Sequence, residues 1–226
     1  MRAGTLAEMA SEWHPAFEEY CECIFELDED DVEVIQARVA ERLHLSRPAV
    51  SEMAKKMEHA ALLTMSKGTI SLTAAGRQLG ETVVRRHRLA ERFLTDILGL
   101  SWAEAHREAG KWEHVMSVEV EQAMARVLGQ PTTCPHGNPI PGSSYKAPDA
   151  SRLVDVQVGT SFTVTRIPEE LEFSPGLLDF LEEAAITPGR HGRVTDSSPD
   201  GTVTIEIDGR RVGVGAFASA RILVLV

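Results

Sequence analysis

Apolar residues recur every three or four positions along three stretches near the start of the chain, which predicts three helices. The stretches run from about 13 to 27, from about 34 to 43 and from about 48 to 59. Ser46 and Pro48 are typical of the start of the third helix, because serine caps helices and proline is accepted in the first turn. Two β-type segments around Lys67-Gly68 predict a hairpin. This order of elements predicts a winged helix-turn-helix.

The middle of the chain has the same helical periodicity. It predicts a helix over 74–98, a helix over 101–109, and a third from 110 or 111 to 128 that is either separate from the second or continuous with it. These helices carry more apolar surface than a lone helix needs, which predicts a dimer interface. The residues are Leu89, Phe93, Leu94, Ile97, Val115, Val120 and Met124.

Proline and glycine become frequent after residue 130, which predicts a linker over 131–150. Short alternating segments follow, with a turn at Asp208-Gly209 and one short helix near 175–184. This pattern predicts a small five-stranded SH3-like barrel. The predicted fold is mainly α with β. Its parts are a winged helix-turn-helix over 1–73, a helical domain over 74–130, the linker over 131–150 and the barrel over 151–226.

The bulk composition is that of a globular protein, with 43% apolar and 25% charged residues. No apolar run approaches the ~20 residues that span a bilayer, and the N-terminus leads into acidic residues rather than an apolar signal core. Three cysteines, an odd number, do not make a disulfide framework. We therefore predict a cytoplasmic protein with no membrane partner and no small organic substrate.

The net charge of −11 argues against a nucleic-acid partner, but the charge is unevenly spread. Carboxylates dominate residues 8–33, whereas basic side chains outnumber acidic ones over 37–67, where the predicted DNA-binding helices lie. A positive face on an acidic protein is compatible with binding double-stranded DNA. Candidate phosphate contacts are Arg38, Arg47, Lys55, Lys56 and Lys67, and candidate groove residues are Ser46, Pro48, Ala49, Ser51 and Glu52.

Histidines and carboxylates occur at helical spacing between 86 and 114. His87 and Glu91 are one turn apart, and His106, Gly110, Glu113 and His114 follow at i, i+4, i+7 and i+8. If each set lies on one helix face, its imidazole and carboxylate groups can share a metal ion. Taken alone, such pairs are more often salt bridges or solvated faces.

Four segments in fixed order give the chain a resemblance to a known family. They are Ala37-Arg-Val-Ala-Glu-Arg-Leu43, Arg86-His-Arg-Leu-Ala-Glu-Arg92, Trp112-Glu-His-Val-Met-Ser117 and Gly137-Asn-Pro-Ile-Pro-Gly142. From about Phe17 onward the sequence resembles the diphtheria toxin repressor family of bacterial metal-dependent regulators, which includes iron-dependent regulators and the manganese-transport regulator. The resemblance implies a winged-helix domain, a helical metal-binding and dimerisation domain, and an SH3-like domain.

The resemblance also implies two metal sites per subunit. The ancillary pattern falls on His87, Glu91 and His106, and the Glu-His pair of the primary site falls on Glu113 and His114.

The remaining ligands implied by the resemblance depart from the family pattern. Glu19 takes the first-helix position, and Glu22 corresponds to a second acidic ligand of the manganese regulator. Gly110 replaces the expected cysteine or glutamate and offers only its carbonyl. Glu172 is the one candidate carboxylate from the barrel.

Oxygen and imidazole donors without thiolate favour Mn²⁺, with Fe²⁺ close behind. Cys21, Cys23 and Cys134, together with His136, are a weaker candidate for a thiolate site. The first two cysteines point to different helix faces and the third is distant in sequence, so we predict buried thiols.

The predicted function is a homodimeric, metal-activated transcriptional repressor that binds operator DNA. Two alternatives remain at this point. One is a winged-helix regulator whose metal sites are structural and do not control DNA binding, which the substitution at Gly110 favours. The other is a metallohydrolase, although Glu113-His114 lacks the His-Glu-x-x-His order of zinc proteases and no nucleophile accompanies it.

Overall fold

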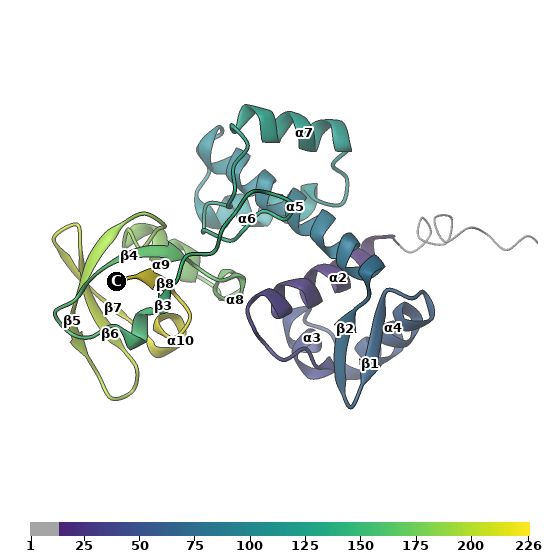
Figure 1. Cartoon of the computed structure of the whole chain (residues 1–226), viewed down its shortest axis with the longest axis horizontal. Coiled ribbons are helices and arrows are strands. Elements are labelled where there is room, and N and C mark those ends of the chain that lie inside the picture. Colours follow the sequence, from purple (N-terminus) through teal and green to yellow (C-terminus); the bar gives the residue numbers. More distant parts are fainter. Residues whose placement is uncertain (1–13) are drawn as a thin grey trace, which may run out of the picture. The chain divides into compact units, whose positions relative to one another are not determined.

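The computed structural model describes residues 14–226 of the chain (Figure 1). The predicted helix start at residue 13 lies outside the described residues. The chain forms two compact units, which are described separately. The first contains the residues up to Arg86 together with Glu113–Val115, and the second contains His87–Trp112 and Met116–Val226.

The first unit is the winged helix-turn-helix, as predicted. Its helices pack Tyr20, Ile24, Val39, Val50 and Met57 into one core with the hairpin. The elements are α2 (His14–Glu29), α3 (Gln36–Arg42), α4 (Arg47–His59), β1 (Leu63–Ser66) and β2 (Thr69–Leu72), followed by the N-terminal part of α5 (Ala74–Asp96).

Local sequence explains how α4 and the hairpin form. The Ser46 side chain accepts a hydrogen bond from the Ala49 N–H at 3.3 Å, which caps the first turn of α4. In the hairpin, Ser66 pairs with Thr69 across the two-residue loop Lys67-Gly68. Both loop residues have positive φ, 50° and 91°, which is the backbone of a tight primed turn.

Helix α5 packs closely on α2 at Gly80. A Cβ added at Gly80 would lie 2.7 Å from the carbonyl oxygen of Cys21, in a helix interior where alanine is otherwise the better residue. At Gly110 in α6 (Trp102–Trp112), an added Cβ would meet open space. Close packing therefore requires glycine at position 80 but not at position 110.

We expect Gly80→Ala and Gly110→Ala to change stability in opposite directions. The overpacked Gly80→Ala should lose about 1–3 kcal/mol, whereas Gly110→Ala should gain about 1 kcal/mol from helix propensity. Thermal unfolding followed by circular dichroism measures both. Equal shifts of the same sign would contradict the close α5–α2 packing.

In the second unit, α5 is followed by α6 and α7 (Val118–Val127), and the predicted helix from 110 to 128 is not continuous. Helix α6 runs through Gly110 and ends at Trp112, so Glu113 and His114 lie in a turn instead of on one helix face with His106. Ser117 provides the physical reason, because its side chain accepts a hydrogen bond from the Val120 N–H at 3.3 Å and starts a new helix.

The predicted linker over 131–150 is only partly a linker. Cys134, His136, Asn138 and Ile140 are at most 1% exposed, and the Cys134 N–H donates to the Asn138 carbonyl to close a turn. The proline-rich segment therefore forms a fixed, buried turn. Only the later part, from 143 onward, is mostly exposed and extended.

The C-terminal part is built on a single six-stranded sheet in the order β3-β8-β4-β5-β6-β7, one strand more than the five predicted. The additional strand is the very short β3, whose two residues pair with β8 near the chain end. The strands are β3 (Ser151–Arg152), β4 (Ser161–Arg166), β5 (His191–Ser197), β6 (Val203–Ile207), β7 (Arg210–Val214) and β8 (Leu223–Leu225).

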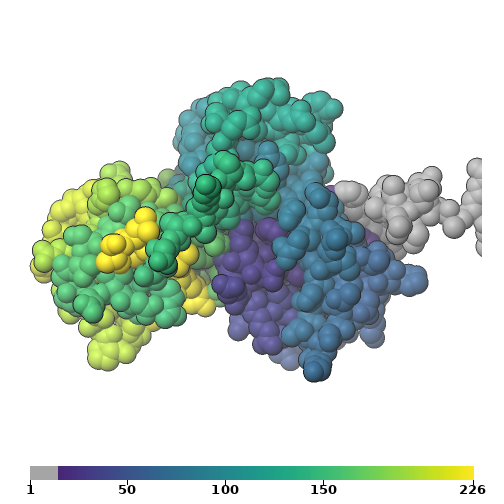
Figure 2. Space-filling model, viewed as in Figure 1, coloured from purple at the N-terminus to yellow at the C-terminus, as the bar shows by residue number. Residues whose placement is uncertain are grey.

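Short helical segments complete this part: η1 (Leu153–Asp155), α8 (Glu169–Glu172), α9 (Leu177–Glu183) and α10 (Ala216–Ser219). The sheet core includes Phe162, Val164, Ile205 and Ile222, and Trp102 at the start of α6 packs into it. The C-terminal residues lie on the surface (Figure 2). Over the described part of the chain, no helix has the length and apolar character needed to cross a membrane.

Candidate metal centre

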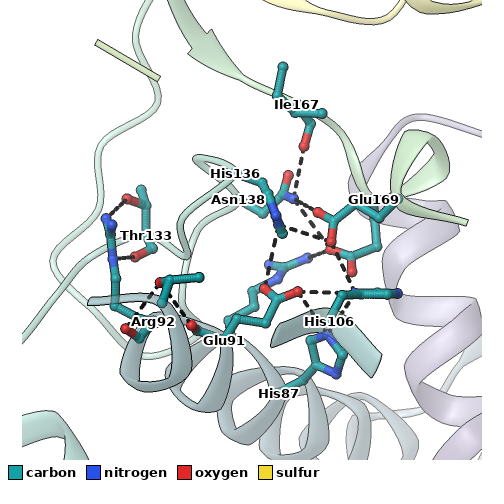
Figure 3. A network of polar contacts seen from close by, with 12 residues as sticks. His87, Glu91, Arg92, His106, Thr133, His136, Asn138, Ile167 and Glu169 are labelled. Atoms are coloured by element: carbon teal, nitrogen blue, oxygen red, sulfur yellow. Dashed lines mark hydrogen bonds and ion pairs between the residues drawn. The ribbon is translucent and has the colours of Figure 1, made fainter. Parts of the chain in front are cut away.

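Five buried or nearly buried side chains from four segments of the second unit come together. Figure 3 labels His87, Glu91, His106 and His136 among them. Helix α5 contributes His87 and Glu91, α6 contributes His106, the buried turn contributes His136, and α8 contributes Glu172. His87, Glu91, His136 and Glu172 are each at most 6% exposed. Residues distant in sequence thus form one polar cluster inside the protein.

The two carboxylates hold the histidines together. Glu91 Oε1 lies 3.0 Å from His106 Nδ1 and 3.2 Å from His87 Nε2. Glu172 Oε2 lies 3.2 Å from His106 Nδ1 and 2.9 Å from His136 Nδ1. The facing nitrogens of His87 and His106 are 3.3 Å apart. Figure 3 shows His87, Glu91, His106 and His136 directed toward the same small volume.

This arrangement fits a divalent metal ion. Ligands bound at 2.0–2.2 Å are separated from their neighbours by roughly 3.0–3.5 Å, and the donor atoms here have that spacing. Glu91 Oε2, Glu172 Oε2 and both ring nitrogens of His136 are buried and lack a hydrogen bond of regular geometry within the described residues. Buried polar atoms of this kind are costly unless something else binds them.

The charges of the buried groups support the same conclusion. Glu91, Glu169 and Glu172 are three buried carboxylates, and Arg88 is the buried guanidinium beside them. With neutral imidazoles this leaves two negative charges, which a divalent cation balances.

In the absence of metal, the carboxylates favour protonated histidines. Burial lowers the pKa of His106, but Glu172 and Glu91 outweigh it and raise the pKa to about 10. Burial likewise lowers the pKa of His136, and the same two carboxylates raise it well above its usual value. Burial raises the pKa of Glu91, but His136 and His87 hold it well below its usual range. Metal binding must therefore displace protons from these rings.

A set of hydrogen bonds orients the cluster from outside. Asn138 Nδ2 donates to Glu172 Oε1 at 2.8 Å and to the Ile167 carbonyl at 2.9 Å, so Glu172 Oε2 is left for the histidines. Arg88 donates to Glu169 at 3.2 Å and to the Pro139 carbonyl at 2.5 Å. Ligand-orienting groups of this kind contribute strongly to metal affinity.

The first unit contains a second polar cluster. His114 Nδ1 lies 2.7 Å from Glu18 Oε2, and His114 Nε2 lies 3.1 Å from Glu113 Oε1. A carboxylate oxygen of Glu22 is within 4.8 Å of one of Glu113. Hydrogen bonds with Glu113 and Glu18 raise the pKa of His114 to about 10. The cluster joins α2 to the turn after α6.

On α2 it is Glu18, and not the predicted Glu19, that contacts His114 in the structure. Glu19 is exposed, whereas Glu18 is 1% exposed and contacts His114. The two differ by one position, or about 100° around the helix. Spacing does not separate the two, because residues three and four positions before Glu22 both lie on its side of the helix.

Comparisons with known proteins agree with this architecture. Residues 13–68 match the family model of the iron dependent repressor N-terminal DNA binding domain, and residues 73–142 match that of the iron dependent repressor metal binding and dimerisation domain. Residues 151–226 match the FeoA domain. The chain belongs to the iron-dependent repressor family.

Individual relatives cover nearly the whole chain. The iron-dependent repressor IdeR of Mycobacterium tuberculosis is 41% identical over 205 residues, covering 85% of this chain and 88% of the relative. The diphtheria toxin repressor of Corynebacterium diphtheriae is 37% identical over 205 residues, covering 86% and 90%. Among solved structures, a manganese-dependent transcriptional repressor in complex with manganese has a TM-score of 0.83 and 31% identity, covering 92% of this chain and 99% of the other.

In this repressor-family chain the candidate DNA-binding residues are on the surface of the winged-helix unit. Arg38, Ser46, Arg47, Pro48, Ala49, Glu52, Lys55, Lys56 and Lys67 are exposed, and Ser51 is half-buried. Lys56 Nζ lies 2.8 Å from Glu52 Oε1, and this hydrogen bond lowers the pKa of Glu52. Lys56 therefore offsets the negative charge that Glu52 would bring to a DNA groove.

Three residues that matter to the first cluster were not identified from sequence as part of it. Arg88 and Asn138 lie inside the segments that carry the family resemblance, but spacing alone gave them no role. His136 was considered only with the cysteines, and the structure instead places it against Glu172 and Glu91. Nothing in the local sequence indicates that the turn folds back onto α5 and α8.

Proposed function

We propose that this protein is a metal-activated transcriptional repressor that binds operator DNA as a homodimer and responds to Mn²⁺ or Fe²⁺. The observation that carries the proposal is the buried cluster of His87, Glu91, His106 and Glu172, whose donor spacing and uncompensated charge suit a divalent cation. The second cluster, Glu18 with Glu22, Glu113 and His114, is the proposed second site.

A bound cation would act as an electrostatic cross-link in each cluster. In the second unit it would take the place of the protons on the histidines and connect α5, α6 and α8 through one centre. In the first unit it would hold α2 against the turn at Glu113–Val115. A 100-fold rise in operator affinity requires about 2.7 kcal/mol of coupling free energy, which is a modest part of the free energy of binding a structural metal.

DNA contacts are proposed at the exposed face of α4 and the hairpin. Arg38, Arg47, Lys55 and Lys67 would contact phosphates, and residues at the start of α4 would meet base edges. The carboxylate of Glu52 can accept a hydrogen bond from cytosine N4.

Dimerisation is proposed through apolar side chains at the end of α5 and on α7. Ile97, Leu98, Val118, Val120 and Val127 are each at least 46% exposed, so their side chains are available to a partner subunit. The proposal is of a cytoplasmic regulator without enzymatic activity, a membrane partner or a small organic substrate, and the similarity to transcriptional repressors supports it.

The test is a DNA-binding titration of the full chain with and without metal. A duplex is first selected from randomised DNA in the presence of Mn²⁺, and binding is then measured by fluorescence anisotropy with Mn²⁺, with anaerobic Fe²⁺, and with a chelator. We expect affinity to rise about 100-fold with metal. Equal affinity in the chelator would contradict the proposal and favour a regulator with structural metal sites.

Asn138→Ala is expected to weaken metal binding without removing a ligand. Glu172 would lose the donor that fixes its Oε1, so its Oε2 would be less well placed for the cation. The expected loss is roughly 10- to 100-fold in Mn²⁺ affinity at this site, measured by calorimetry. Ser143→Ala is the control, because the Ser143 hydroxyl bonds only the Thr132 carbonyl and the Tyr145 N–H among the contacts described. Similar losses in both variants would contradict an orienting role.

A further inference from the structure

Trp102 belongs to α6, but its side chain completes the core of the barrel. It lies four residues before His106, so the two side chains project from the same face of α6. Trp102 is 7% exposed and packs in the hydrophobic cluster that also holds Leu171, Leu178 and Leu181 of the barrel. A large aromatic side chain of this kind buries roughly 150–250 Å² and dominates the energetics of a core. Helix α6 and the barrel therefore share one core.

The backbone of Trp102 makes a second connection to the barrel. Its N–H donates a hydrogen bond to Glu182 Oε2 on α9 at 3.0 Å. The first N–H groups of a helix have no partner within the helix, and a carboxylate there also interacts favourably with the positive end of the helix dipole. Ser101 and Glu104 form a capping box, in which the Ser101 N–H donates to Glu104 Oε2 and the Glu104 N–H donates to Ser101 Oγ. Glu182 therefore caps an N–H that the capping box leaves open.

These contacts fix the short helix that carries Glu172. Helix α8 is a single turn of four residues, and so short a helix depends on packing rather than on its own hydrogen bonds. Leu171 packs in the same core as Trp102, and the next residue, Glu172, lies with Oε2 3.2 Å from His106 Nδ1. The ring of Phe173 packs edge-to-face on the ring of His106, with centroids 5.3 Å apart. The position of Glu172 thus follows from the packing of the barrel on α6.

We propose that Trp102 and Glu182 are positioning residues, which hold the barrel on α6 and so place Glu172 for the metal of the first cluster. This inference rests on the proposed function. The anchoring contacts join protein atoms directly, so they hold the barrel before a cation binds. A ligand that is already in place avoids the entropy cost of ordering it on binding, which raises affinity. The metal affinity of the cluster therefore depends on two residues that supply no ligand.

The first measurement is amide hydrogen exchange of the full chain in chelator, followed by NMR. The Trp102 N–H should exchange slowly in the wild type, because Glu182 caps it, and about tenfold faster or more in Glu182→Ala. Glu183→Ala, at the exposed neighbour on α9, is the matched control and should leave this exchange unchanged. Fast exchange in wild-type protein that becomes slow only with Mn²⁺ would overturn the inference, since the metal would then be what docks the barrel.

The second measurement is a calorimetric titration with Mn²⁺ in the Glu18→Gln background, which removes a ligand of the proposed second site. Trp102→Ala should weaken Mn²⁺ binding roughly 10- to 100-fold and Glu182→Ala roughly 10-fold. Trp102→Phe should recover most of the affinity, because a ring again fills the core. Trp112→Leu is the control, since Trp112 is on the same helix but packs in the core of the helical domain. It should lower the thermal midpoint and leave Mn²⁺ affinity unchanged.

Circular dichroism establishes that each variant is folded before it is titrated. If Trp102→Ala does not fold, Glu182→Ala carries the test, because it leaves the shared core intact. Wild-type Mn²⁺ affinity in Glu182→Ala, or in a folded Trp102→Ala, would overturn the inference. Operator binding by the wild type that ignores metal would instead refute the proposed function, and the exchange of the Trp102 N–H in chelator would still test the anchor.

Discussion

Glu18→Gln is expected to remove most of the metal-dependent gain in operator affinity, about 100-fold or about 2.7 kcal/mol. The Glu18 carboxylate is 1% exposed and lies 2.7 Å from His114, so it is the group through which α2 would share a cation with the turn after α6. An amide keeps the size of the side chain but loses the charge. The readout is anisotropy of the selected duplex in saturating Mn²⁺ and in chelator.

Glu19→Gln is the matched control for this prediction. It removes the same charge from the neighbouring residue of the same helix, but Glu19 is exposed. Its metal response should equal that of the wild type, and its chelator-state affinity should rise only slightly from the lost negative charge. A loss in Glu19→Gln with none in Glu18→Gln would restore the assignment made from sequence.

Arg88→Leu is expected to produce the largest loss of stability, about 3–5 kcal/mol. The Arg88 side chain is completely buried, and its guanidinium lies 3.2 Å from Glu169 Oε2 and donates to the Pro139 carbonyl. Removing it leaves a buried carboxylate beside Glu91 and Glu172 with less compensating charge. Urea unfolding of the metal-free protein measures the loss.

The double variant Arg88→Leu/Glu169→Leu tests the physical cause. If the loss comes from an uncompensated buried charge, removing Glu169 as well should recover a large part of it. Additive losses in the double variant would show that packing of the long Arg88 side chain, and not its charge, stabilises the unit. Saturating Mn²⁺ should also stabilise Arg88→Leu, because the cation supplies positive charge to the same group of carboxylates.

Local sequence was sufficient to predict those features of the structure that depend on neighbouring residues alone. Ser46 and Pro48 predicted the start of α4, and Lys67-Gly68 predicted the hairpin turn, because capping and turn conformation depend on neighbouring residues only. His87 and Glu91 were recognisable as a pair because helical spacing fixes which side chains are adjacent. The break at Trp112 was missed, since the periodic pattern continued across Ser117 although its cap starts a new helix.

Glu172 was identified from sequence as a candidate metal ligand, but its position relative to the histidines could not be predicted. It was the one carboxylate in the stretch 171–176, and the structure brings it 3.2 Å from His106 through the short helix α8. Asn138 then fixes its orientation from a segment that composition marked as a linker. Proline-rich composition is shared by extended linkers and by rigid buried turns, so it could not separate the two.

The sequence by itself determined the family, the order of the three parts of the fold and the pairing of His87 with Glu91 on α5, because these depend on local periodicity and spacing. Only the tertiary structure decided that Glu18 and not Glu19 faces His114, and that His136 reaches Glu172 and Glu91. The first choice depends on which side of α2 is buried, and the second on a turn packed far from its ligand partners in sequence. Both are set by long-range packing, which the local sequence pattern does not encode.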